Sequence, residues 1–353
     1  MITAPLPPTV NADYLTAALP KAGVLGEGCV RDVVVERSFD TLLSHIFRLQ
    51  LRYEGPVGGP EFLILKAGLA DRPGGPWKGG CQEVAFYSQV AAAMSDHLVP
   101  RCFDAHWDAE TSAWHLLLED LTDSHLAATR WPLPPTLQQC ESIVRARARF
   151  HAAWWDDPRL GVTIGSWQDV TTQAQQLQQF TENLAGFTER YGDRLSPGRR
   201  DLYARLIDCE PRLQMRYRSH RNMTIVQGDS HVWNCFLPRD GAKDDVLLFD
   251  WDSWHVDTAS DDLAYMMAIH WYPERRRLVE RPLLDCYHAA LQACGVKDYT
   301  RRELEDDYRL SVLWNIATPV WQEANGIPPV IWWNNLERIF MAVDDLDCRE
   351  LLS

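Results

Sequence analysis

The sequence predicts an α+β protein whose first part is rich in β-strands and whose larger second part is mostly helical. Short runs of β-branched and aromatic residues alternate with turn residues from about residue 30 to residue 118. From residue 137 onward, apolar residues recur mainly at helical spacing. With 353 residues, of which 46% are hydrophobic, the chain can form two lobes, which we expect to span residues 1–121 and 122–353.

Composition narrows the possible partners. The net charge of −14 argues against nucleic-acid binding, which needs basic surfaces. An acidic surface could attract a cationic ligand, but it also serves solubility. The nine cysteines are scattered without a Cys-x-x-Cys pair, and no apolar run reaches the length of a membrane span. We therefore expect a cytoplasmic protein that does not enter a membrane.

The first strands carry candidate phosphate contacts. The runs 33–37 and 45–53 favour two strands, joined by a turn that contains Ser44. Its hydroxyl could donate to a phosphate, although a serine in a turn needs no such function. The run 61–67 predicts a buried strand near whose end stands Lys66, and a helical stretch from residue 82 to about 94 contains Glu83. Because a buried lysine is costly without a partner, we predict a Lys66–Glu83 ion pair. The alternative is a lysine at a strand edge and a solvated acid in a first helical turn.

The remaining elements follow in order. The runs 99–107 and 112–118 predict a hairpin that leads into Glu119, Asp120 and Leu121. Apolar spacing then predicts helices over residues 137–155, 168–191, 197–218, 275–293, 301–318 and 333–349. An asparagine at position 11 is typical of the N-cap of a short helix through residue 19.

The segment 226–252 holds the residues with a chemical pattern. Asp229 follows Gly228, Asn234 stands five positions later, and Asp250 ends the apolar run Val-Leu-Leu-Phe. A hydroxyl that attacks a phosphate needs a carboxylate to accept its proton, and the phosphate charge needs a cation held by oxygen ligands. A kinase catalytic loop and its metal ligands contain Asp, Asn and Asp in this order. The pattern therefore predicts phosphoryl transfer.

These residues also resemble a known family. Gln-Gly-Asp-Ser-His-Val-Trp-Asn, followed by Leu-Phe-Asp-Trp-Asp, is similar to the His-Gly-Asp-x-His-x-x-Asn and Asp-x-Asp/Glu signatures of the aminoglycoside phosphotransferase and choline kinase-like superfamily. Gln227 stands where that family has histidine, and Asp257 stands where glycine is frequent. The resemblance implies a protein-kinase-like bilobal fold. Residues 1–121 would cover the nucleotide, and residues 122–353 would hold the catalytic loop and the acceptor.

The resemblance also assigns roles. It implies binding of ATP, with GTP as an option, together with Mg²⁺. Asp229 would be the catalytic base, Asn234 and Asp250 would bind Mg²⁺, and Lys66, oriented by Glu83, would bind the phosphates. The other predicted nucleotide contacts are Ser44 in the turn and the hinge from Glu119 to Leu121, where backbone groups would meet the adenine.

The acceptor and the rival functions remain open at the level of sequence. The acceptor would be a hydroxylated small molecule, similar to an aminoglycoside, an amino alcohol or a sugar, and a cationic one is among the options. Candidate residues to line its site are Trp271, Trp314, Trp321, Trp332 and Trp333. One rival is a catalytically weak nucleotide-binding regulator, motivated by Gln227. The other is a metal-dependent hydrolase that would use His231, Asp229, Asp250 and Asp252.

Overall fold

The computed structural model describes residues 6–41, 43–55, 58–69, 79–239 and 246–353. By its internal contacts the chain divides into two compact units. Unit 1 comprises Met1–Ala127 and Phe236–Trp254, and unit 2 comprises Ala128–Cys235 and His255–Ser353. The expected boundary at residue 121 thus lies close to the observed one, but residues 236–254 pack with the first unit rather than the second. They do so because their strands join a sheet with a strand of unit 1.

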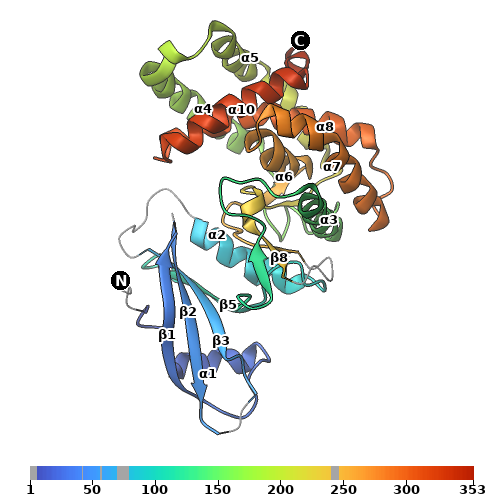
Figure 1. The fold of residues 1–353 in the computed structure, drawn as a ribbon. Helices are drawn as coiled ribbons and strands as arrows, with labels where there is room; N and C mark the ends of the chain where they lie inside the picture. Colours follow the sequence, from blue (N-terminus) through green and yellow to red (C-terminus); the bar gives the residue numbers. More distant parts are fainter. Residues whose placement is uncertain (1–5, 42, 56–57, 70–78, 240–245) are drawn as a thin grey trace. The chain divides into compact units, whose positions relative to one another are not determined.

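A five-stranded antiparallel sheet forms the body of unit 1, in the order β1-β2-β3-β5-β4 (Figure 1). The predicted strands are confirmed, with ends that shift by a few residues. Their bounds are β1 Val30–Asp40, β2 Ser44–Tyr53, β3 Phe62–Gly68, β4 Cys102–Trp107 and β5 Trp114–Glu119. Helix α1, Ala12–Lys21, packs beside β1, and its N-cap is the side chain of Asn11, which accepts a hydrogen bond from the backbone of Tyr14 at 2.9 Å.

The two faces of this sheet have different tasks, because successive side chains of a strand point to opposite sides. On one face, Leu49 of β2 and Leu63 and Leu65 of β3 are fully buried in a core shared with α1. The opposite face carries Ile46, which pairs in register with Lys66. The same alternation that builds the core therefore leaves a second face for a ligand.

The rest of unit 1 consists of short elements. The predicted helix over residues 82–94 begins earlier, as α2, Gly79–Ala85, and continues as a π-turn, Phe86–Val90, and a 3-10 turn, Ala91–Ala93. A three-stranded sheet in the order β6-β8-β9 completes the unit. Its strands are β6 His125–Ala127, β8 Cys235–Pro238 and β9 Leu247–Leu248.

Unit 2 is mostly helical, as the sequence predicts. Its α-helices are α3 Leu137–Ala153, α4 Val170–Tyr191, α5 Pro197–Leu213, α6 Ser260–Ala264, α7 Pro273–Ala293, α8 Arg301–Trp314, α9 Thr318–Ala324 and α10 Pro329–Asp345. Its 3-10 and π segments are Gly192–Arg194, Gln214–Ser219, Val232–Asn234, Tyr265–Ile269, Asn315–Ala317 and Cys348–Leu352.

The helix ends explain where prediction and structure differ. The helix expected over residues 197–218 ends at Leu213, and a 3-10 segment follows it. The helix expected over 301–318 ends at Trp314, because Pro319 suits the first turn of a new helix, α9. The last helix begins at Pro329 instead of residue 333, again with proline in its first turn.

A two-stranded antiparallel ribbon lies among these helices. It consists of β7, Thr224–Val226, and β10, His255–Asp257, with Thr224 opposite Asp257 and Val226 opposite His255. The segment with the predicted catalytic residues continues directly from the Val226 end of this ribbon. Within the described residues, no helix is both long and apolar enough to cross a membrane.

Candidate active site

Unit 1 contains a cavity of about 430 Å³ on the open face of its sheet. All the residues that the sequence analysis assigned to the nucleotide, apart from the metal ligand Asn234 of unit 2, lie in the wall of this one cavity. They are Ser44, Lys66, Glu83, Glu119, Leu121 and Asp250. These six residues come from three strands, a helix and two loops, so the fold brings together positions up to 206 residues apart in sequence.

Lys66 is the centre of an ion cluster in this cavity. Its Nζ donates to Glu83 Oε1 at 2.9 Å and to Asp250 Oδ1 at 2.6 Å. Burial alone would lower the pKa of Lys66, but the two carboxylates outweigh it and raise the pKa above its ordinary value. Lys66 is therefore a fixed positive charge. The predicted Lys66–Glu83 pair is present, and Asp250 is added to it.

Asp250 has an unusual backbone. Its φ is +68°, in the left-handed region that aspartate tolerates better than most residues. The next residue, Trp251, stacks on Phe86 with ring centroids 4.0 Å apart, and its backbone N–H donates to Glu83 Oε1 at 3.4 Å. Glu83 thus contacts both Lys66 and the chain that follows Asp250. These contacts fix the Asp250 carboxylate at the polar end of the cavity.

The turn between β1 and β2 is closed by hydroxyl groups. Ser44 is buried, its Oγ lies 2.9 Å from Thr41 Oγ1, and its backbone N–H donates to the same Thr41 oxygen at 3.0 Å. Both residues line the cavity. A hydroxyl pair provides donors for an anion and also stabilises the turn, so both readings of Ser44 from the sequence fit its position.

The predicted hinge lies at the other side of the same cavity. The Glu119 side chain accepts hydrogen bonds from His97 Nε2 and from the backbone of Arg101, each at 2.7 Å. Burial opposes ionisation, but these two donors lower the pKa of Glu119 below its ordinary value. The carbonyl of Leu121 accepts from the backbone of His125 at 2.9 Å. The segment is therefore held from both ends, which suits recognition through backbone groups.

Sequence reasoning missed the apolar wall of the cavity. Phe236 of β8 and Phe249, which precedes Asp250, stack with ring centroids 3.9 Å apart, and both line the cavity. Ile46 and Ile64 line it from the sheet. Strand alternation could have found the two isoleucines, since each stands two positions before or after a residue already singled out. The two phenylalanines give no such signal, because Phe236 lies in the four-residue strand β8 and Phe249 follows the two-residue strand β9.

The predicted catalytic loop lies in unit 2, between β7 and the 3-10 turn Val232–Asn234. Asn234 Nδ2 donates to the backbone oxygen of Asp229 at 2.9 Å and to its Oδ2 at 3.2 Å. His231 Nε2 lies 3.6 Å from the same Oδ2. The Asp229 carboxylate is about one-third exposed. It is therefore oriented by two neighbours and still accessible to a ligand.

A buried carboxylate anchors this loop. Asp262 accepts the backbone N–H groups of Gln227 and Gly228, each at 3.0 Å, and Arg147 donates to it at the same distance. His151 Nε2 lies 3.2 Å away. Gly228 has a φ of +80°, which explains why glycine stands before Asp229.

The charge of Asp262 is secured by its partners. Burial would raise the pKa of its carboxyl, but Arg147, His151 and the backbone donors lower it well below the ordinary value. Burial in turn lowers the pKa of His151 below its ordinary value. Sequence reasoning missed Arg147, because an arginine inside a helical pattern does not reveal that it is buried.

An aromatic cluster surrounds the loop. The ring of His231 lies 5.4 Å from those of Trp233 and His270, and Tyr265 lies 5.1 Å from His270. Burial, then the neighbouring His231 and Arg338, lower the pKa of His270 well below its ordinary value. Of the tryptophans proposed from sequence, Trp271 and Trp332 are buried in packing, Trp321 is partly exposed, and Trp314 lines a separate cavity.

The donor set can be compared with the needs of Mg²⁺. This ion prefers hard oxygen ligands and usually takes only one or two carboxylates from the protein, with phosphates and water as the rest. Asp250 offers a carboxylate. The oxygen of Asn234 faces away from Asp229, because the amide nitrogen takes that side. The oxygen of each side chain, taken by itself, is of the kind that Mg²⁺ accepts, and the joint assignment of Asp250 and Asn234 to Mg²⁺ stays a prediction. No cluster of three or more His, Cys, Asp or Glu side chains that could hold a metal by itself occurs among the described residues.

Comparisons with known proteins agree with this arrangement at the level of fold. No protein-family model and no curated protein matches the sequence. The structure is similar to a candidate aminoglycoside phosphotransferase from Ralstonia eutropha, with a TM-score of 0.57 and 14% identity over 93% of this chain and 94% of the other. The structure is also similar to a microcompartment-associated aminopropanol kinase, with a TM-score of 0.55 and 11% identity over 90% of each chain.

A choline/ethanolamine kinase family protein from Mesorhizobium loti gives a TM-score of 0.52 and 13% identity, over 94% of this chain and 92% of that protein. All three matches span nearly the whole chain and include both units. The chain therefore has the α+β, protein-kinase-like fold of the aminoglycoside phosphotransferases and the choline/ethanolamine kinases, with a β-rich N-terminal part and a mostly helical remainder.

Proposed function

We propose that this protein is a small-molecule kinase that transfers a phosphoryl group from ATP, with Mg²⁺, to a hydroxyl of its acceptor. The observation that carries the proposal is the Lys66–Glu83–Asp250 cluster at the polar end of a cavity with aromatic and aliphatic walls. A purine needs such walls, and phosphates need a fixed cation beside them. We assign the nucleotide to residues 1–121 together with the segment 236–254, and the acceptor to the rest.

Each polar residue then has a role. Lys66, held by Glu83, binds the nucleotide phosphates, and the hydroxyls of Thr41 and Ser44 close the turn beside them. Asp250 and Asn234 hold Mg²⁺, which neutralises charge on the phosphate oxygens when it is bound. Asp229 accepts the proton of the acceptor hydroxyl, and Asn234 and His231 fix the orientation of its carboxylate.

The acceptor class rests on the fold neighbours. They include proteins described as an aminopropanol kinase and as a choline/ethanolamine kinase family protein. We propose a hydroxylated small molecule that carries an amine and is bound by residues of unit 2 near Asp229. GTP in place of ATP is compatible with the same cavity chemistry.

The first test is thermal unfolding of the protein with and without ATP and Mg²⁺. A ligand that binds only the folded state stabilises it by about 2.7 kcal/mol at a concentration one hundred times its Kd. We expect a rise of the unfolding midpoint that requires Mg²⁺ and is lost in Asp250→Asn. Asp208→Asn, on an exposed face of α5, is the matched control and should keep the rise. If neither ATP nor GTP raises the midpoint, the proposed function is wrong.

The second test is ADP release with a panel of aminoglycosides, amino alcohols and sugars. Asp229→Asn should fold and bind nucleotide like the wild type but lose about 10²–10⁴-fold in turnover, the usual contribution of a general base. Retained turnover would refute the role of Asp229. Nucleotide binding without turnover on any acceptor would favour the rival function, a nucleotide-binding regulator, to which Gln227 points.

A further inference from the structure

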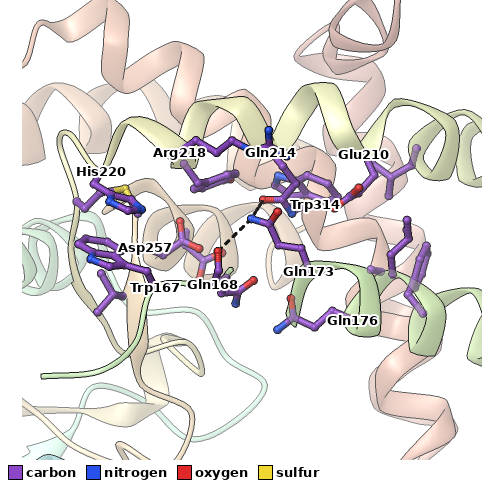
Figure 2. Close-up of a pocket in the computed structure, with 18 of the residues that line it drawn as sticks. Trp167, Gln168, Gln173, Gln176, Glu210, Gln214, Arg218, His220, Asp257 and Trp314 are labelled. Carbon is purple, nitrogen blue, oxygen red and sulfur yellow. Dashed lines mark hydrogen bonds between the residues drawn. The ribbon is translucent and has the colours of Figure 1, made fainter. Parts of the chain in front are cut away.

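Unit 2 contains a second cavity, of about 300 Å³, which the proposed function does not use (Figure 2). Its walls come from the start of α4, the end of α5 with the 3-10 segment that follows it, the strand β10 with the start of α6, and the end of α8. All of these belong to one unit. The cavity is therefore a property of unit 2 alone.

Three carboxylates line this cavity. Asp257 and Asp261 come from β10 and α6, and Glu210 comes from α5. In the view of Figure 2, Glu210 and Asp257 lie on opposite sides of Gln173. Glu210 is more than nine-tenths buried, and burial raises the pKa of its carboxyl above the ordinary value, although Gln214 and Arg218, which line the same cavity, oppose this. An acid in this position is costly unless a positive charge joins it.

Asp261 is a second carboxylate of this wall whose ionisation is disfavoured. Burial, and then the neighbouring Asp257, raise the pKa of Asp261 to about 7. His255 lies beside this pair, with its Nε2 3.7 Å from Asp257 and 3.9 Å from Asp261. A histidine at these distances compensates the two carboxylates only in part, and only when it is protonated.

The other walls suit an organic ligand. Trp167 stacks on His220 with ring centroids 4.0 Å apart, and Trp314 stands at another wall. Gln173 is buried and donates to Gln214 Oε1 at 3.3 Å. Aromatic faces attract organic cations, and amide oxygens accept hydrogen bonds from ammonium groups.

The cavity lies away from the predicted catalytic base. Met223, Val256 and Asp257 line it, and Asp257 pairs with Thr224, the first residue of β7. Asp229 follows the other end of β7, beyond Val226. Because a strand rises about 3.3 Å per residue, a ligand in this cavity would be separated from Asp229 by the length of the ribbon.

We propose that this cavity is a second ligand site that binds a small organic cation carrying ammonium groups, at a place distinct from that of the phosphorylated acceptor. The three carboxylates of the wall outnumber its one guanidinium, Arg218, and so disfavour an anion, while the tryptophan faces favour an organic cation over a hydrated metal ion. Asp257 is the residue that stood out in the sequence because glycine is frequent at its position in similar proteins. In this chain that position supplies a carboxylate to the cavity.

Titration calorimetry without nucleotide tests the proposal. The probes are 1,4-diaminobutane and tetramethylammonium, with 1,4-butanediol as an uncharged control. We expect the cations to bind and the diol to give no heat. Asp257→Asn should weaken binding at least about tenfold, the loss that follows from one charge-assisted contact. Asparagine keeps an oxygen that can accept the backbone N–H of Thr258, so this variant should fold. Asp208→Asn is the matched control and should bind as the wild type.

The pH dependence provides a second readout. The groups that face Asp261 are Asp257 and His255 of β10, Asp262 of α6 and Tyr217 of the 3-10 segment. As pH rises through about 7, Asp261 becomes charged, and its negative charge favours a bound cation. Cation affinity should therefore increase from about pH 6 to about pH 8.

The increase with pH should be smaller in Asp261→Asn. The proposal is overturned if none of the cations binds, if the diol binds equally well, or if Asp257→Asn weakens binding no more than Asp208→Asn. These measurements are made without nucleotide. A negative result here would therefore leave the kinase proposal intact, and a negative result in the nucleotide tests would leave the second-site proposal intact.

Discussion

Replacing Asp262 with asparagine tests whether the loop around Asp229 depends on one buried charge. Wild-type Asp262 accepts hydrogen bonds from Arg147 and from the backbone of Gln227 and Gly228, each at 3.0 Å. Asparagine keeps one oxygen for the backbone groups but removes the negative charge beside a fully buried arginine. Breaking a buried ion pair by removing one partner costs about 3–5 kcal/mol. For a domain of this size we expect a fall of about 6–20 °C in Tm.

Urea unfolding of four proteins measures this coupling: the wild type, Asp262→Asn, Arg147→Met and the double variant. The two residues share a direct contact, so the double-mutant cycle should give an interaction free energy of about 0.5–3 kcal/mol. Additive single effects, or a loss below about 1 kcal/mol in Asp262→Asn, would refute the reasoning.

The loss of folding stability at acid pH provides an independent measurement. The folded pKa of Asp262 is lowered, because Arg147 and His151 outweigh burial. The stability it contributes is therefore present above the unfolded pKa of about 3.9 and is lost as pH falls toward the folded value. Between about pH 5 and pH 2, the wild type should lose more stability than Asp262→Asn. Equal losses would mean that this charge does not stabilise the fold.

Two further predictions concern single side chains. Phe249→Ala removes one ring of the stacked pair with Phe236, and the nucleotide affinity measured by calorimetry should fall about 2–10-fold. Phe103→Ala lies outside the cavity and should leave this affinity unchanged. His270, whose pKa burial lowers well below its ordinary value, should stay neutral from about pH 6 to pH 8 in ¹⁵N NMR spectra. Since the unfolded chain takes up that proton below about pH 6.5, His270→Gln should reduce the loss of stability between pH 7 and pH 5, and an unchanged slope would contradict the assignment.

The sequence was sufficient for those features that depend on local pattern. Strand alternation and helical spacing located most elements within a few residues, and the cost of burying Lys66 without a partner predicted its contact with Glu83. The position of Asp250 after an apolar run indicated that it ends a strand. In the structure it follows the two-residue strand β9, separated from it by Phe249, and contacts Lys66 across 184 residues of sequence.

Features that depend on long-range packing could not be predicted. Nothing near Arg147 in the sequence indicates that it meets Asp262, because the contact spans 115 residues. The pairing of Phe236 with Phe249 depends on how β8 and β9 lie in their sheet. The cavity beside Asp257 is lined by four separate segments of the chain. The sequence of each segment alone gives no sign that the four meet around a cavity. Helix ends at Leu213 and Trp314 also shifted, because packing competes with weak local preference at such positions.

The discontinuity of unit 1 has a consequence for the order in which the protein can form during synthesis. Domains tend to fold as they emerge from the ribosome, N-terminal part first. The five-stranded sheet of unit 1 ends at Glu119, but the three-stranded sheet and part of the cavity wall need residues 236–254, so they must wait for more than one hundred residues of unit 2 to be made. Until then Lys66 and Glu83 lack Asp250, and Phe236 and Phe249 do not yet close the cavity. A nascent chain that stops at residue 127 would thus carry an exposed sheet face, whereas one that has passed residue 254 can complete the cavity.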